Sequence, residues 1–248
     1  MASDAQNNPF IRHLTSSDKD VRDEALESLR KYLGAQKQIS ELDLLKLWKG
    51  LFYCLWMQDK PALQQALSRD LASIVSRLQM PVVLPFIRAF WITMSREWSH
   101  IEALRLDKYL YLIRKYLNAS FEFLSRQKWN KDILAEWNTI MEETPLNPKD
   151  MKIPNGLRYH VMDIWVDELG KVSGDKWEKE PGSEMLETLV KPIETMKKEG
   201  ALKVLRVAAQ ECLDEEELKS WRGIVDEKAD ESMGSDEDSE QEWGGFAD

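Results

Sequence analysis

Apolar residues recur along this chain at helical spacing, and this periodicity constrains the fold more than any other feature. When successive residues of 18–33 are placed about 100° apart, the larger apolar side chains fall within one arc of about 140°. They are Val21, Ala25, Leu26, Leu29, Tyr32 and Leu33. No segment combines a period of two with the β-branched residues of a strand. Because the 248 residues include only 11 Gly and 9 Pro, we expect an all-α fold of long elements with short joints.

Start and stop signals divide the chain into about nine helices. A serine followed three residues later by an acid predicts helix starts at Ser17, Ser40 and Ser99, and Gly34 predicts the end of the first helix. The expected helices are 18–33, 41–57, 61–78, one entered at Pro81 or Pro85, 100–117, 130–143, 155–171, 184–198 and 201–213. Residues 121–127 extend the fifth helix or form a short sequel, and 172–182 is a loop. Successive pairs have the size of HEAT or armadillo units, so we expect stacked helix pairs forming one helical-repeat domain over 1–225.

Residues 226–248 differ from the rest of the chain. They contain ten acids and one lysine and end in a Trp-Gly-Gly-Phe segment, a composition that predicts a disordered acidic tail. Two interpretations of this tail stay open. It is either a solubilising terminus or a segment whose large aromatics, Trp243 and Phe246, anchor it on a basic partner.

The charge of the remaining residues is divided along the chain. Residues 1–131 carry a net charge of +6 and residues 132–225 a net charge of −7. A uniformly basic nucleic-acid-binding protein has a different distribution. We therefore expect protein contacts to outweigh RNA contacts, with direct contact to ribosomal RNA secondary.

Motifs that carry chemistry are missing from the sequence. The two cysteines, Cys54 and Cys212, have no CxxC spacing, and no glycine-rich nucleotide-binding motif occurs. The acid pairs at 142–143 and 167–168 lie on amphipathic helices, where solvated faces explain them. We expect no catalytic residue, no cofactor, no metal and no small-molecule substrate. We also expect no membrane association, because charged residues interrupt the most apolar stretches.

The second expected helix is the most informative segment. Its apolar arc predicts a core that includes Leu45, Trp48, Phe52 and Trp56, and from a later helix we add Leu104 and Leu110. The opposite side carries Lys46, Lys49, Tyr53 and Met57, together with Gly50. A solvated face and a partner-binding face explain this mixture equally well. The second interpretation rests on the tyrosine and methionine among cations, a mixture typical of interfaces.

Segment 101–113 carries apolar residues on nearly all sides, which indicates a helix packed by several neighbours. Its charged residues, Arg105, Asp107 and Lys108, then need partners. A structural ion-pair network is favoured over direct contact with RNA phosphates.

Several blocks resemble one known family. They are Asp18 to Leu33 (DKDVRDEALESLRKYL), Leu42 to Met57 (LDLLKLWKGLFYCLWM), Phe90 to Trp98 (FWITMSREW), Leu104 to Tyr109 (LRLDKY) and Gly156 to Trp165 (GLRYHVMDIW). They are similar to the eukaryotic nucleolar ribosomal RNA processing protein one family. The similarity follows the same order from about residue 10 to 170, and the LWKGLFYCLWM block is its most specific part.

The resemblance implies a helical-repeat protein of the nucleolus. It implies a non-enzymatic assembly factor of early large-subunit (pre-60S) precursors, needed for processing of precursor ribosomal RNA. Its implied partners are other nucleolar assembly factors and the precursor particles. Without the resemblance, the residues predict only stacked helices, no active site and an acidic tail. The alternative function is then a generic helical-repeat adaptor in transport or signalling.

Overall fold

The computed structural model describes residues 13, 14, 16 and 18–224. Within these residues the chain forms eleven α-helices and three short 3-10 helices, and none of them lies in a β-strand. In chain order the elements are α3 (Lys19–Ala35), α4 (Glu41–Trp56), α5 (Pro61–Ser73), η1 (Ile74–Arg77), α6 (Met80–Glu97), η2 (Trp98–His100), η3 (Ala103–Arg105), α7 (Leu106–Arg126), α8 (Lys131–Glu143), α9 (Asn155–Asp163), α10 (Trp165–Lys179), α11 (Glu184–Glu199), α12 (Lys203–Leu213) and α13 (Glu216–Trp221).

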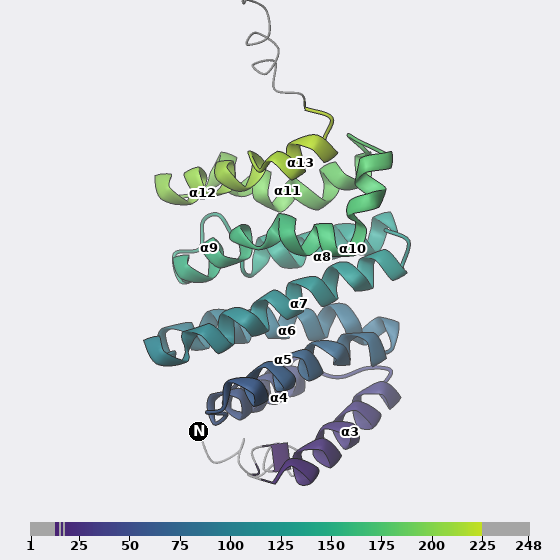
Figure 1. Cartoon of the computed structure of the whole chain (residues 1–248), viewed down its shortest axis with the longest axis vertical. Helices are drawn as coiled ribbons and strands as arrows, with labels where there is room; N and C mark the ends of the chain where they lie inside the picture. The colour runs from purple at the N-terminus through teal and green to yellow at the C-terminus, as the bar shows by residue number, and fades with distance from the viewer. Residues whose placement is uncertain (1–12, 15, 17, 225–248) are drawn as a thin grey trace, which may run out of the picture.

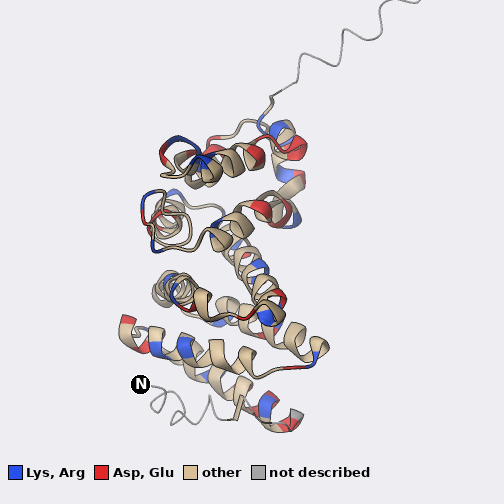
Figure 2. Ribbon diagram, turned by 90° about the vertical axis from the view of Figure 1, so that its left-hand side faces the viewer, with Lys and Arg blue, Asp and Glu red and all other residues tan. Residues whose placement is uncertain are grey.

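The helices stack in two parallel ladders (Figure 1). In one ladder α4 packs on α6, α6 on α8 and α8 on α11. In the other, α5 packs on α7, α7 on α10 and α10 on α13. Helices α9 and α12 pack on each other, with α9 also packed on α7 and α10 and α12 packed on α11, and Figure 2 shows the stack from that side. The expected stack of helix pairs is therefore confirmed.

The ends of α3 and the start of α4 test the predicted helix start and stop residues. Ser40 caps α4 as predicted, because its hydroxyl accepts the backbone N–H of Asp43 at 3.1 Å. Helix α3 is capped by Asp18 instead of Ser17, since the Asp18 carboxylate accepts the Asp20 N–H at 2.9 Å. Gly34 does not end the helix. A Cβ at Gly34 would lie 3.2 Å from the Arg77 carbonyl oxygen, so this glycine admits close approach of η1.

Two later boundaries differ from the prediction. The predicted helix 100–117 begins only at Leu106 and runs to Arg126, so residues 121–126 continue it. Residues before it form two short 3-10 turns. The predicted helix 155–171 breaks at Ile164, and α10 continues to Lys179 through the predicted loop with a kink at Ser173. Periodicity does not reveal these breaks, because both halves of each segment keep an apolar face.

A tryptophan-rich core runs through the stack. Six tryptophans are fully buried: Trp48, Trp91, Trp137, Trp165, Trp177 and Trp221. Trp48 contacts the rings of Phe86, Phe90 and Tyr116 with centroids 4.9–5.0 Å apart. The buried residues form one contiguous cluster from Leu14 to Trp221. Because the core is continuous, the stability of each helix pair depends on its contacts with the neighbouring pairs.

The residues predicted to form the core differ in how far they are buried. Trp48 and Phe52 are fully buried, as expected. Leu45 and Trp56 are half-buried and pack against the core, and Leu110 is also half-buried. The assignment of Leu104 to the core is wrong, because 99% of its surface is exposed. Leu104 lies in η3, before α7 begins at Leu106, so it does not belong to the apolar face that α7 packs on the core.

Candidate partner-binding face on α4

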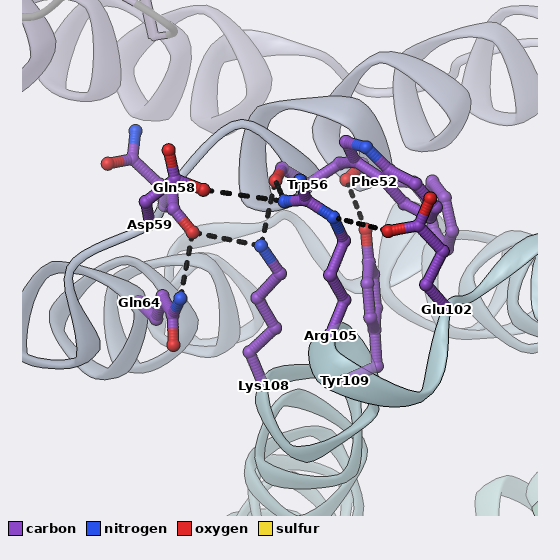
Figure 3. Close-up of polar contacts among 9 residues, drawn as sticks. All are labelled: Phe52, Trp56, Gln58, Asp59, Gln64, Glu102, Arg105, Lys108 and Tyr109. Atoms are coloured by element: carbon purple, nitrogen blue, oxygen red, sulfur yellow. Dashed lines mark hydrogen bonds and ion pairs between the residues drawn. The ribbon is translucent and has the colours of Figure 1, made fainter.

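The C-terminus of α4 is joined to the start of α7 by cationic side chains (Figure 3). Arg105 donates to the Trp56 carbonyl at 2.8 Å, and Lys108 donates to the Trp56 and Gln58 carbonyls at 2.7 and 2.9 Å. These carbonyls lie at or just beyond the last turn of α4, where helical oxygens lack intrahelical partners and cations are favourable. The Tyr109 hydroxyl adds a bond to the Phe52 carbonyl at 2.9 Å.

This junction decides the role of the charged residues in segment 101–113. Lys108 is only 5% exposed, and burial, followed by the nearby charge of Arg105, lowers its pKa to about 8. Arg105 also pairs with Glu102 and Asp59 at 3.2 and 3.4 Å. Both cations serve the packing of α7 on α4, which supports the structural interpretation. Their main partners are backbone carbonyls, whereas the sequence led us to expect ion pairs.

Mixed apolar and cationic side chains form a stripe along the outer side of α4. Leu42, Lys46, Lys49, Tyr53 and Met57 are separated by three or four residues, the spacing of one helical face. Leu42, Tyr53 and Met57 are 61%, 39% and 63% exposed. We call these five residues the α4 stripe. Of the predicted partner-binding residues, Lys46, Lys49, Tyr53 and Met57 therefore share one surface.

The cations of the α4 stripe are left without acidic partners. Neither Lys46 nor Lys49 forms an ion pair with any residue that the structure describes. On the neighbouring α6, in contrast, Arg88 binds Glu41 and Arg96 binds Glu97, both at 2.8 Å. Gly50 is buried on the inner side of α4 instead of lying in the stripe. The stripe thus offers positive charge and apolar surface together.

One contributor to this surface was not predicted from the sequence. Neither predicted face of this helix includes Leu42, although its spacing from Lys46 and Lys49 places it in line with them. Leu104 is exposed close to the Arg105–Trp56 contact, where the guanidinium lies 5.1 Å from the Trp56 ring. The predicted Trp243 and Phe246 anchors lie outside the described residues.

The described residues offer little for catalysis. Burial raises the pKa of the Cys54 thiol to about 12 and also raises that of Cys212, so both stay protonated and are weak nucleophiles. Burial lowers the pKa of His160, whose Nε2 lies 2.9 Å from the Leu110 carbonyl oxygen. Over the described part of the chain, no group of three metal-ligating side chains gathers. No helix described there is both long and apolar enough to cross a bilayer.

Comparison with known proteins identifies relatives. Residues 5–244 match the model of the family described as nucleolar protein Nop52. The chain is 43% identical to human ribosomal RNA processing protein 1 homolog B over 171 residues, which is 66% of this chain and 22% of that protein. It is 33% identical to human homolog A over 255 residues, 98% of this chain and 55% of that protein. The Drosophila melanogaster homolog is 31% identical over 175 residues, with 68% of this chain and 25% of that protein covered. The chain thus spans between about a fifth and about half of these relatives.

Proposed function

Because this chain belongs to the nucleolar protein Nop52 family, we propose that it acts in ribosomal RNA processing in the nucleolus. Its relatives are named ribosomal RNA processing proteins. Within that process we propose a non-enzymatic assembly factor of early pre-60S particles that acts as a protein-binding scaffold. Other nucleolar assembly factors and the precursor particles are its proposed partners.

The observation that carries this proposal is the α4 stripe. The stack holds two lysines, neither of them paired with an acid of the described residues, in line with exposed Leu42, Tyr53 and Met57. Apolar residues at this density favour a protein partner, because RNA backbones are bound mainly by clustered cations. With two lysines, we expect weak and salt-sensitive binding to bare RNA. Tight sequence-selective RNA binding in physiological salt would contradict a protein-binding scaffold.

The test reverses both lysines in the tagged full chain. Lys46→Glu/Lys49→Glu should lower co-sedimentation with precursor large-subunit particles, while the melting temperature stays close to that of the wild type. Lys179→Glu/Lys191→Glu changes charge equally at two exposed positions on α10 and α11 and serves as the control. Equal loss in both variants would refute the role of the stripe. Recovery of the wild-type chain only in free or membrane fractions would refute the assembly function and favour an adaptor in transport or signalling.

The tail carries a second part of the proposal. We propose that its acids steer residues 226–248 towards a basic partner and that Trp243 and Phe246 then fill apolar pockets. Deleting the tail and substituting Trp243→Ala/Phe246→Ala should both lower recovery of the same partner from particles. If neither change affects recovery of any partner, residues 226–248 only help to keep the chain in solution.

A further inference from the structure

A second surface of opposite character lies at the other end of the stack. A cleft of about 580 Å³ opens between the start of α7, helix α9 and the end of α12. Helices α9 and α12 lie one above the other on the left of Figure 1, and Figure 2 looks onto that side. A cleft of this size accommodates side chains of a bound segment.

The floor of the cleft is apolar, and its Trp98 ring is closely packed. Trp98, Leu110, Met162 and Ala208 contribute to it. The Trp98 ring lies against Gly156, where an added Cβ would be 3.3 Å from the indole, so the glycine allows the ring to close on α9. Along α12 the apolar surface continues outside the cleft, because Val204 is 56% exposed one turn before Ala208. The floor therefore offers apolar surface that no described element covers.

The rim of the cleft is acidic. Asp163, Glu211 and Glu215 line it, and neither lysine nor arginine is among its lining residues in the described chain. None of these three carboxylates forms an ion pair with a described residue. Arg114 on α7 is already bound to Asp167 and Glu168 at 3.0 and 2.8 Å.

Glu215 on the rim is also influenced by neighbouring carboxylates. Burial, followed by the charges of Asp167, Asp163 and Glu217, raises its pKa to about 7. Carboxylates from α9, α10 and α13 thus act on one carboxyl group, and of these Asp167 is itself paired with Arg114. A bound cation would relieve this repulsion.

We propose that this cleft is the docking site for a lysine- or arginine-bearing segment of a protein partner, with an apolar side chain of that segment on the cleft floor. Charge complementarity selects this occupant, since three unpaired carboxylates repel RNA and other anions. A small metal ion is not the expected occupant, because the described residues there hold no group of metal-ligating side chains. The apolar floor instead favours an occupant with an apolar side chain. This partner class goes beyond the proposed assembly function and concerns a surface separate from the α4 stripe.

The experiment measures binding of three fluorescein-labelled probes to the full chain in physiological salt. The first is a short peptide in which lysines flank a pair of leucines, the second has glutamate in place of lysine, and the third is oligo-uridine RNA. We expect the lysine peptide alone to bind. Asp163→Asn/Glu211→Gln should weaken its binding about two- to thirtyfold, since it removes two exposed ion pairs.

The matched control is Glu122→Gln/Asp175→Asn, which removes the same charge from two other exposed positions. It should leave the peptide affinity unchanged. A further variant, Ala208→Trp, fills the floor without changing charge and should weaken binding as well. Equal weakening by the two charge variants, no binding of the lysine peptide, or RNA binding of similar strength would each overturn the proposal. None of these outcomes bears on particle association through the α4 stripe, so the two proposals fail separately.

Discussion

Substituting Trp48 with alanine tests the core most directly. Its side chain is fully buried, contacts three aromatic rings and donates from Nε1 to the Phe86 carbonyl at 3.1 Å. A buried indole removes about 200 Å² from water, worth about 5 kcal/mol at about 25 cal/mol per Å². Residual burial in the unfolded chain reduces this to about 3–4.5 kcal/mol. The lost ring contacts and the remaining cavity bring the expected cost to about 3–5 kcal/mol.

Trp56 provides the internal comparison. The sequence pattern ranked the two tryptophans equally, but Trp56 is half-buried beneath the Arg105 guanidinium. Its loss should cost about 1–2 kcal/mol. Urea unfolding followed by circular dichroism gives both free energies of unfolding, and Trp48→Phe serves as the conservative control. A Trp48→Ala cost no larger than that of Trp56→Ala would refute the reasoning.

Three further predictions concern stability. The pKa of Lys108 is about 8 in the folded chain and 10.5 by ordinary reference, so the unfolded state binds more protons between these values and stability rises with pH there. Between pH 7.5 and 9.5 the wild type should therefore gain about 1–2 kcal/mol relative to Lys108→Met in urea unfolding. For Glu215 the folded pKa is raised, so its contribution is present at low pH and is lost as pH rises through about 7. Glu215→Gln should stabilise the chain by about 1–2 kcal/mol more at pH 8 than at pH 5, measured by thermal melting in both buffers. Gly170→Ala should lower the melting temperature, because its Cβ would lie 3.0 Å from the Trp221 ring, whereas at Gly174 the same ring is 3.7 Å away and alanine should be tolerated. Equal melting temperatures for the two alanine variants would contradict this packing.

The sequence predicted the fold through properties that are local. Apolar periodicity identified the helices, and the serine before α4 caps it as expected. It failed where a distant element decides the boundary. The late start of α7 accompanies the contacts of Arg105 and Lys108 with the end of α4, about 50 residues earlier in the chain. No local pattern contains that information.

The candidate surfaces were predicted unevenly for the same reason. Lys46, Lys49, Tyr53 and Met57 lie on one helix, so helical spacing alone placed them together. The acidic cleft joins α7, α9 and α12, and its rim residue Asp163 is separated by about 50 positions from Glu211 and Glu215. Only the order of the stack brings Asp163 beside Glu215. Leu104 was wrongly predicted for a related reason. It is an apolar residue in an apolar segment, but it is exposed because the helix begins after it.

The two surfaces should act independently in binding a particle. They share no residue, and they lie on different elements of one contiguous core. Their opposite charges predict partners of opposite charge, so one partner is not expected to occupy both. Mutations at separate sites without common partners usually add in free energy. Combining Lys46→Glu/Lys49→Glu with Asp163→Asn/Glu211→Gln should therefore multiply the two losses in affinity for purified precursor particles. A combined loss no greater than the larger single loss would mean that both surfaces depend on one binding event, and the separation of partners by charge would then be wrong.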